Sequence, residues 1–145
     1  MDTELIARVL VSLVAFVQGT GPLLVDLNRT HATNPEWTPH ARFHVVWQVL
    51  TQTGVSLTVL TLLWVFPSRL HTWIGVLLTF NWCFMFFATL SNVARFEGTL
   101  KDETTGIPPF VFRLGSRRLE IDTNLFAVLV AASTLSVAVL ILLLS

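Results

Sequence analysis

Four long runs of apolar residues, separated by polar segments, divide this chain. They cover about residues 5–25, 40–66, 70–92 and 124–144. Each run is close to the ~20 residues that an α-helix needs to cross a hydrocarbon core of roughly 30 Å. The pattern predicts an all-α fold: a single transmembrane domain built as an integral membrane four-helix bundle.

Capping and turn residues mark the ends of these runs. Thr38-Pro39 predicts a helix start, because a threonine accepts from the free amides of the first turn and proline already has a helical φ. Pro67-Ser68-Arg69 ends the second run, and so short a connection predicts that the second and third helices are antiparallel neighbours. Asp122-Thr123-Asn124 offers caps for the last helix.

The longest polar segment lies between the third and fourth runs, at residues 93–121. It is interrupted by Gly106-Ile107-Pro108-Pro109, and the apolar Phe110-Val111-Phe112 follows. This order predicts a loop or short hairpin that folds back onto the mouth of the bundle.

The composition fits one compact membrane domain. Of the 145 residues, 53 % are hydrophobic and 12 % are charged, which is too apolar for a soluble domain of this size. The formal net charge is zero, so no nucleic-acid partner is expected. The expected partners are the membrane and a lipophilic small-molecule substrate or lipid. Whether the chain forms a homo-oligomer is left open by the sequence.

The distribution of basic residues predicts the orientation of the chain. Four spans place the first and third connections on the same side of the membrane. Seven Lys and Arg residues lie on that side and two on the other: Arg29, Arg42, Arg95, Lys101, Arg113, Arg117 and Arg118 against Arg8 and Arg69. The positive-inside rule therefore predicts cytoplasmic long loops and outside termini in a multi-pass membrane protein.

A ladder of polar residues enters the second run. His40, His44, Gln48 and Gln52 recur every four residues, so they share one slowly drifting stripe of the helix. A polar stripe inside a membrane is expected to face protein or a cavity rather than acyl chains. Asn81, in the middle of the third run, is likewise expected to find a partner inside the bundle.

Together with the first connection, the ladder predicts a polar pocket at one membrane face. The catalytic candidates are His31, His40, His44 and Asp26. The substrate-binding candidates are Asn28, Asn34, Arg42, Trp47, Gln48, Asn81 and Glu97.

Three interpretations of the histidines stay open. In the first, the histidines cap helices and hold the first connection in place. In the second, one imidazole moves a proton on a lipophilic substrate while a carboxylate orients that imidazole. In the third, His40 and His44 share a helix face and His31 completes a three-histidine metal site. The favoured hypothesis is an isomerase or cyclase that needs no cofactor and no metal. A non-catalytic lipid-binding or small-molecule-binding protein and a metalloenzyme are the alternatives.

Residues 28–44 contain NRTH and then NPEWTPHARFH. They resemble the signature N-x-T-H and N-P-x-W-x-P-H-A-R-F-H of a family of small four-helix microbial membrane proteins with no assigned function. In architecture alone, the chain is similar to the four-helix sterol-isomerase and emopamil-binding group, whose membrane cavity binds lipophilic amines and sterols. That group uses acidic residues within its spans, whereas Asp26 and Glu97 lie at span ends here.

Overall fold

The computed structural model describes residues 3–101 and 108–145. Within them it contains four long helices, α1 (Thr3–Val25), α2 (Pro39–Trp64), α3 (Arg69–Ser91) and α4 (Thr123–Leu144). All four are long and apolar enough to cross a membrane. The prediction of a helical bundle with four membrane-length helices is therefore confirmed.

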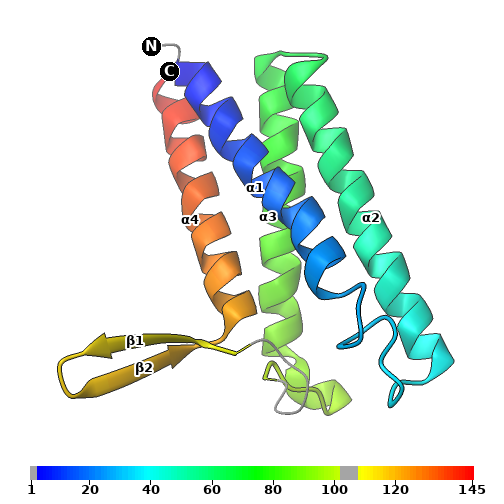
Figure 1. The fold of residues 1–145 in the computed structure, drawn as a ribbon. Coiled ribbons are helices and arrows are strands. Elements are labelled where there is room, and N and C mark those ends of the chain that lie inside the picture. Colours follow the sequence, from blue (N-terminus) through cyan, green and yellow to red (C-terminus); the bar gives the residue numbers. More distant parts are fainter. Residues whose placement is uncertain (1–2, 102–107) are drawn as a thin grey trace.

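The helices run alternately in opposite directions (Figure 1). Both termini and the short 65–68 turn lie at one end of the bundle, and both long connections lie at the other. Helix α1 contacts α2, α3 and α4, and α2 packs against α3. The short connection thus correctly predicted that α2 and α3 are antiparallel neighbours.

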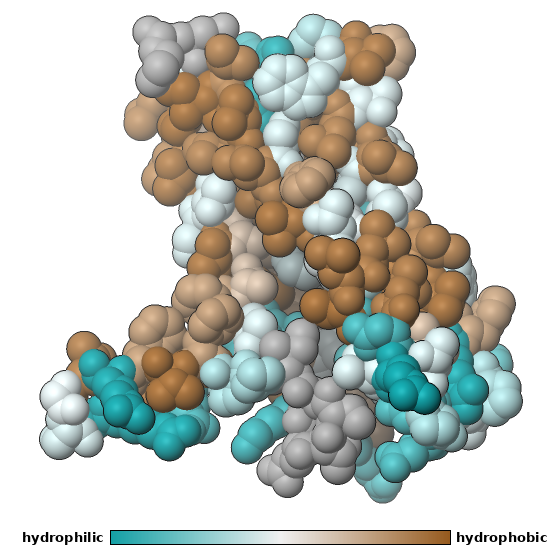
Figure 2. Space-filling model, in the orientation of Figure 1, coloured by the Kyte–Doolittle hydropathy of each residue, from teal (hydrophilic) through white to brown (hydrophobic). Residues whose placement is uncertain are grey.

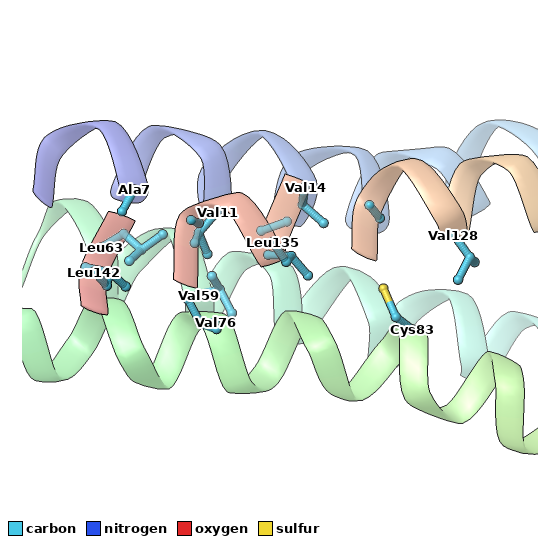
Figure 3. Packing of buried hydrophobic residues seen from close by; sticks show 13 residues of the cluster. Ala7, Val11, Val14, Val59, Leu63, Val76, Cys83, Val128, Leu135 and Leu142 are labelled. Atoms are coloured by element: carbon cyan, nitrogen blue, oxygen red, sulfur yellow. The ribbon is translucent and has the colours of Figure 1, made fainter. Parts of the chain in front are cut away.

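The bundle core consists of small and branched side chains from all four helices. Val11, Val59, Val76 and Leu135 meet in its middle (Figure 3). Large apolar side chains point outward instead, including Phe16, Leu77 and Leu143. Figure 2 shows this apolar surface over the helices and the hydrophilic residues gathered at the end with the long connections. This distribution suits helices whose outer faces meet acyl chains.

Helices α1 and α2 approach closely where small residues face each other. A Cβ added at Gly19 would lie 2.6 Å from the Cβ of Ser56, so only glycine fits there. Beside this contact, the Thr53 hydroxyl is 3.0 Å from the Gly19 carbonyl oxygen and 2.9 Å from that of Val49. Small residues therefore allow backbone approach and bring a polar group into the contact.

The predicted caps are present. The Thr38 hydroxyl accepts from the Ala41 amide at 3.2 Å, and Pro39 opens α2. An Asp122 carboxylate oxygen accepts from the amides of Asn124 and Leu125 at the start of α4. These bonds satisfy amides that an uncapped first turn leaves free.

The third connection forms a short 3₁₀ helix, η1 (Val93–Phe96), and then a hairpin of β1 (Phe110–Leu114) and β2 (Arg117–Ile121). The two strands are antiparallel, and Gly115 at the tip has φ +62°. Gly106 and Ile107 of the predicted break lie outside the described residues.

The hairpin projects sideways from the start of α4 (Figure 1), so the prediction that it folds back over the bundle mouth is wrong. Only Asp122 separates β2 from α4, which leaves no linker long enough to reverse the hairpin's direction.

Candidate functional site

The first connection, residues 26–38, is held by its own side chains. The Asn28 side-chain amide donates to the carbonyls of Leu24 and Val25 at the end of α1. Its side-chain oxygen accepts from the Thr30 amide at 2.8 Å. Asn28 therefore closes the C-terminus of α1 and starts the next turn.

Asn34 and Arg42 fix the second half of this connection. Asn34 is 3 % exposed, donates to the Thr30 carbonyl and accepts from the Glu36 amide. The Arg42 guanidinium, one turn into α2, donates to the Trp37 carbonyl through Nε and Nη2. We expected Asn28, Asn34 and Arg42 to bind substrate. In the structure their side chains form hydrogen bonds with backbone groups of the protein itself.

Asp26 and His31 face each other at the end of α1. His31 Nδ1 lies 2.7 Å from the Thr30 hydroxyl and 3.7 Å from Asp26 Oδ1. The His31 ring also meets Trp37 edge-on, with ring centroids 5.2 Å apart. Two acceptors beside Nδ1 favour a proton on that nitrogen, which leaves Nε2 as the basic atom of the neutral ring.

The environment of Asp26 changes its acidity. Burial raises the pKa of Asp26 above its ordinary value, and the charge of the neighbouring His31 partly offsets that rise. A carboxyl group with a raised pKa beside an oriented imidazole is an arrangement that suits proton transfer.

His40 and His44 form a separate pair on the exposed surface of α2. Their Nε2 atoms are 3.0 Å apart, and the two rings meet edge-on. Trp47, another expected substrate-binding residue, lies beside His44 with ring centroids 5.8 Å apart. This pair does not line the bundle cavity.

The three histidines are not gathered around one point. Among residues 3–101 and 108–145, no three His, Cys, Asp or Glu side chains are placed to hold a metal ion. His31, His40 and His44 therefore do not form the three-ligand group that the metal alternative requires.

A cavity of about 350 Å³ lies between α1, α2 and α3. Gln48 and Gln52 line it from α2, and Pro22 lines it from α1. The α3 side consists of Trp82, Met85, Phe86 and Thr89. The Gln52 side-chain nitrogen is buried and has no hydrogen-bond partner within the described part of the chain. The cavity thus has largely apolar walls, and an unpaired donor belongs to one of its lining residues.

The ladder divides between two environments because it turns around the helix. A step of four residues advances about 40° beyond a full turn, so His40 and Gln52 point about 120° apart. The expectation that the stripe faces a cavity holds for Gln48 and Gln52. For His40 and His44 it is wrong, because both are exposed outside the cavity.

Asn81 and Glu97 lie apart from these groups. Asn81 is exposed on α3 and has no side-chain hydrogen bond among the described residues, so the expected partner inside the bundle is absent. The rotation of α3 turns this position outward, while Cys83 and Val76 face the core. Glu97 is exposed and ends η1 with φ 53°.

The cavity walls from α3 were not among the predicted site residues. Trp82, Met85 or Phe86, and Thr89 recur at steps of three and four, which is the spacing of one helix face. That spacing could have identified a shared face, but the sequence does not show which face of α3 meets Gln52. Gln52 itself was placed in the ladder without a binding role.

Fold and site together define a bundle of four helices, each long and apolar enough to cross a membrane, with a cavity between three of them. A family of unknown function, DUF6640, matches residues 10–73, which hold most of α1, all of α2 and the signature region. This match agrees with the expected similarity to a family without an assigned function. No curated protein and no solved structure matches the chain.

Proposed function

We propose that this protein binds a lipophilic small molecule in the cavity between α1, α2 and α3. The observation that carries the proposal is a cavity with aromatic and methionine walls that Gln52 lines, together with a Gln52 side-chain nitrogen that is buried without a hydrogen-bond partner in the described residues. An unpaired amide in a membrane interior costs free energy, and a ligand oxygen would satisfy it once the Gln52 side chain turns its nitrogen into the cavity. A volume of about 350 Å³ is within the range of small-molecule sites.

The lining defines the chemical class of the occupant. Trp82, Met85 and Phe86 offer apolar contacts, which suit a hydrocarbon or ring system. Gln48 and Gln52 offer amide groups, which suit a carbonyl, hydroxyl or ether oxygen. A mostly apolar molecule with one polar oxygen fits both sets of groups.

The test is mass spectrometry of small molecules extracted from the purified protein. Gln52→Leu should lower the amount of bound molecule by about fivefold, the equivalent of one hydrogen bond. Asn81→Leu is the matched control, because it removes an exposed amide of α3 that is not part of the cavity lining. Equal occupancy in both variants would contradict the proposal, as would a wild-type protein that carries no lipophilic molecule.

A second candidate function, proton transfer on the bound molecule, is favoured by the Asp26–His31 pair. Asp26 follows Pro22 of the cavity lining by one helical turn, about 6 Å along the axis of α1. His31 Nε2 then acts as the base, and Asp26 stabilises the imidazolium that forms. An isomerase removes a proton from one carbon and returns it to another. A cyclase adds a proton to a double bond.

This candidate is tested by deuterium exchange. The protein with its co-purified molecule is incubated in D₂O, and carbon-bound deuterium in the molecule is measured. Wild type should incorporate deuterium, and His31→Gln should lose the incorporation while still retaining the molecule. Unchanged incorporation in His31→Gln would exclude His31 as the base.

A further inference from the structure

The β1–β2 hairpin has two chemically different faces. Cross-strand partners share a face, and successive residues along a strand alternate between faces. One face contains the pairs Phe110 with Ile121, Phe112 with Leu119, and Leu114 with Arg117. The other contains Val111 with Glu120, and Arg113 with Arg118. The hairpin is therefore amphipathic, with basic residues on the second face and near the tip.

The apolar face is turned toward the side of the bundle. Phe110 and Phe112 lie against Phe126 in the first turns of α4, with ring centroids 4.6 and 6.0 Å away. Thr123 donates to the Pro108 carbonyl at 2.9 Å and fixes the base of the hairpin. In Figure 2 hydrophobic residues lie along the upper edge of the hairpin, the side of the helices, and hydrophilic residues lie mostly along its lower edge.

Beyond Phe126, the hairpin has no covering in the described structure. Leu114 is 70 % exposed and Leu119 is 50 % exposed. Isolated two-stranded hairpins are marginal in water, and exposed apolar side chains on one would add to that weakness. An apolar surface that covers this face would stabilise the hairpin.

We propose that the hairpin lies in the headgroup region of the membrane that the helices cross, with its apolar face immersed and its arginines attracting anionic phospholipids. The position supports this, because the hairpin leaves the bundle sideways where the apolar surface of α4 begins (Figures 1 and 2). Its apolar side continues the surface that acyl chains already cover. Arg117 shares the apolar face near the tip, where its long side chain reaches lipid phosphates.

The charges of the hairpin favour lipid over a second copy of the chain. The described hairpin strands contain three arginines, Arg113, Arg117 and Arg118, and one carboxylate, that of Glu120, whose Oε1 lies 2.6 Å from Arg118 Nη2. Two hairpins pairing with each other would bring these like charges together, whereas anionic headgroups neutralise them. The apolar face is also small compared with the 20–30 residues per partner of a stable protein interface.

The experiment measures which face meets lipid. Full-length protein with Cys83→Ala carries a nitroxide label at Leu119→Cys or at Glu120→Cys, neighbours on opposite faces. Each variant is placed in vesicles of phosphatidylcholine with phosphatidylglycerol, and collisions with lipid-soluble oxygen and a water-soluble nickel complex are compared. The oxygen-to-nickel ratio should be several-fold higher at residue 119. Equal ratios would overturn the proposal, and protection of residue 119 from both reagents would indicate a protein contact instead.

Two further arms make the result decisive. Leu114→Cys and Val111→Cys repeat the face comparison on the other strand, so damage by one label does not decide the outcome. Omitting phosphatidylglycerol should lower the ratio at residue 119. Arg113→Gln/Arg118→Gln, which leaves only Arg117 in the hairpin, should weaken this lipid dependence, whereas Arg29→Gln/Arg95→Gln, which removes equal charge from exposed sites, should keep it. A ratio that does not depend on phosphatidylglycerol would overturn the role of anionic headgroups.

Discussion

Gly19 of α1 lies so close to Ser56 of α2 that a methyl group at Gly19 would be 2.6 Å from the Ser56 Cβ. That Cβ is fixed to the α2 backbone, so Gly19→Ala must separate the two helices. We expect a loss of about 1–3 kcal/mol in the free energy of unfolding, measured by denaturation in detergent. Gly54→Ala is the control, because nothing lies within 4 Å of a Cβ there. Similar stability of the two variants would show that this contact is not tight in solution.

Asn34 offers a test of whether the polar residues of the first connection bind ligand or hold structure. Asn34→Ala removes one donor and one acceptor from a buried position, so we expect a loss of about 1–3 kcal/mol. Thr33→Ala, at an exposed neighbour, should change stability little. An Asn34→Ala protein that keeps its melting temperature but loses its bound molecule would support the original substrate-binding assignment.

Asp26 predicts a specific dependence of stability on pH. Because burial raises its pKa in the folded protein above the ordinary value of 3.8, the folded chain holds this proton more tightly than the unfolded chain. The resulting stabilisation is fully present below pH 3.8 and is lost as pH rises through the raised value. Asp26→Asn should therefore raise the melting temperature at pH 7 and have a smaller effect near pH 4.

Glu36→Gln is the control for that measurement, because it removes an exposed carboxylate of the same connection. If Asp26→Asn lowered the melting temperature at pH 7, the attraction between Asp26 and His31 would outweigh the cost of burial. The same variant in the deuterium-exchange assay reports separately on proton transfer.

The four helices and their caps followed from the sequence because they depend on local properties. The length of an apolar run is a property of one continuous segment, and Thr38-Pro39 and Asp122 act within one helical turn. Neither requires tertiary information. The direction of the hairpin was not predictable in this way. It depends on the contact of Phe110 and Phe112 with Phe126, which lies in a different element.

The site was predictable only in part for a similar reason. Sequence spacing showed that His40, His44, Gln48 and Gln52 share a drifting stripe, but the rotation of α2 against its neighbours decides which of them reach the cavity. Asn81 illustrates the same limit, since a single polar residue on a helix carries no information about which way it faces. The first connection was recognisable as a dense polar motif, although its use of Asn28 and Arg42 for backbone bonds needed the fold.

The orientation of the bundle remains a prediction from charge. The structure places both long connections at the same end, so the seven-to-two excess of Lys and Arg lies at one face of the bundle. We expect reporters fused at Ser145 and inserted at Gly115 to lie on opposite sides, with Gly115 in the cytoplasm. A cytoplasmic Ser145 would reverse the orientation, and two reporters on one side would contradict the span count.

The division of the polar ladder predicts two different phenotypes on one helix. His44→Phe keeps the bulk of an exposed ring that packs beside Phe43 and Trp47, and it removes only the bond to His40. We expect its free energy of unfolding to change by less than about 0.5 kcal/mol and its occupancy by the co-purified molecule to stay unchanged. Gln52→Leu, two turns further along, should lose occupancy.

Melting in detergent and quantification of the bound molecule, made on the same preparations, separate these outcomes. His40→Phe/His44→Phe extends the test, since the double variant leaves no imidazole on α2 to substitute for the missing one. If the double variant retained the molecule but lost deuterium incorporation, proton transfer would belong to the His40–His44 pair and substrate would have to approach α2 from outside the cavity. If both functions persisted, His31 would be the remaining imidazole at this end of the bundle, because His71 lies at the opposite end, at the start of α3.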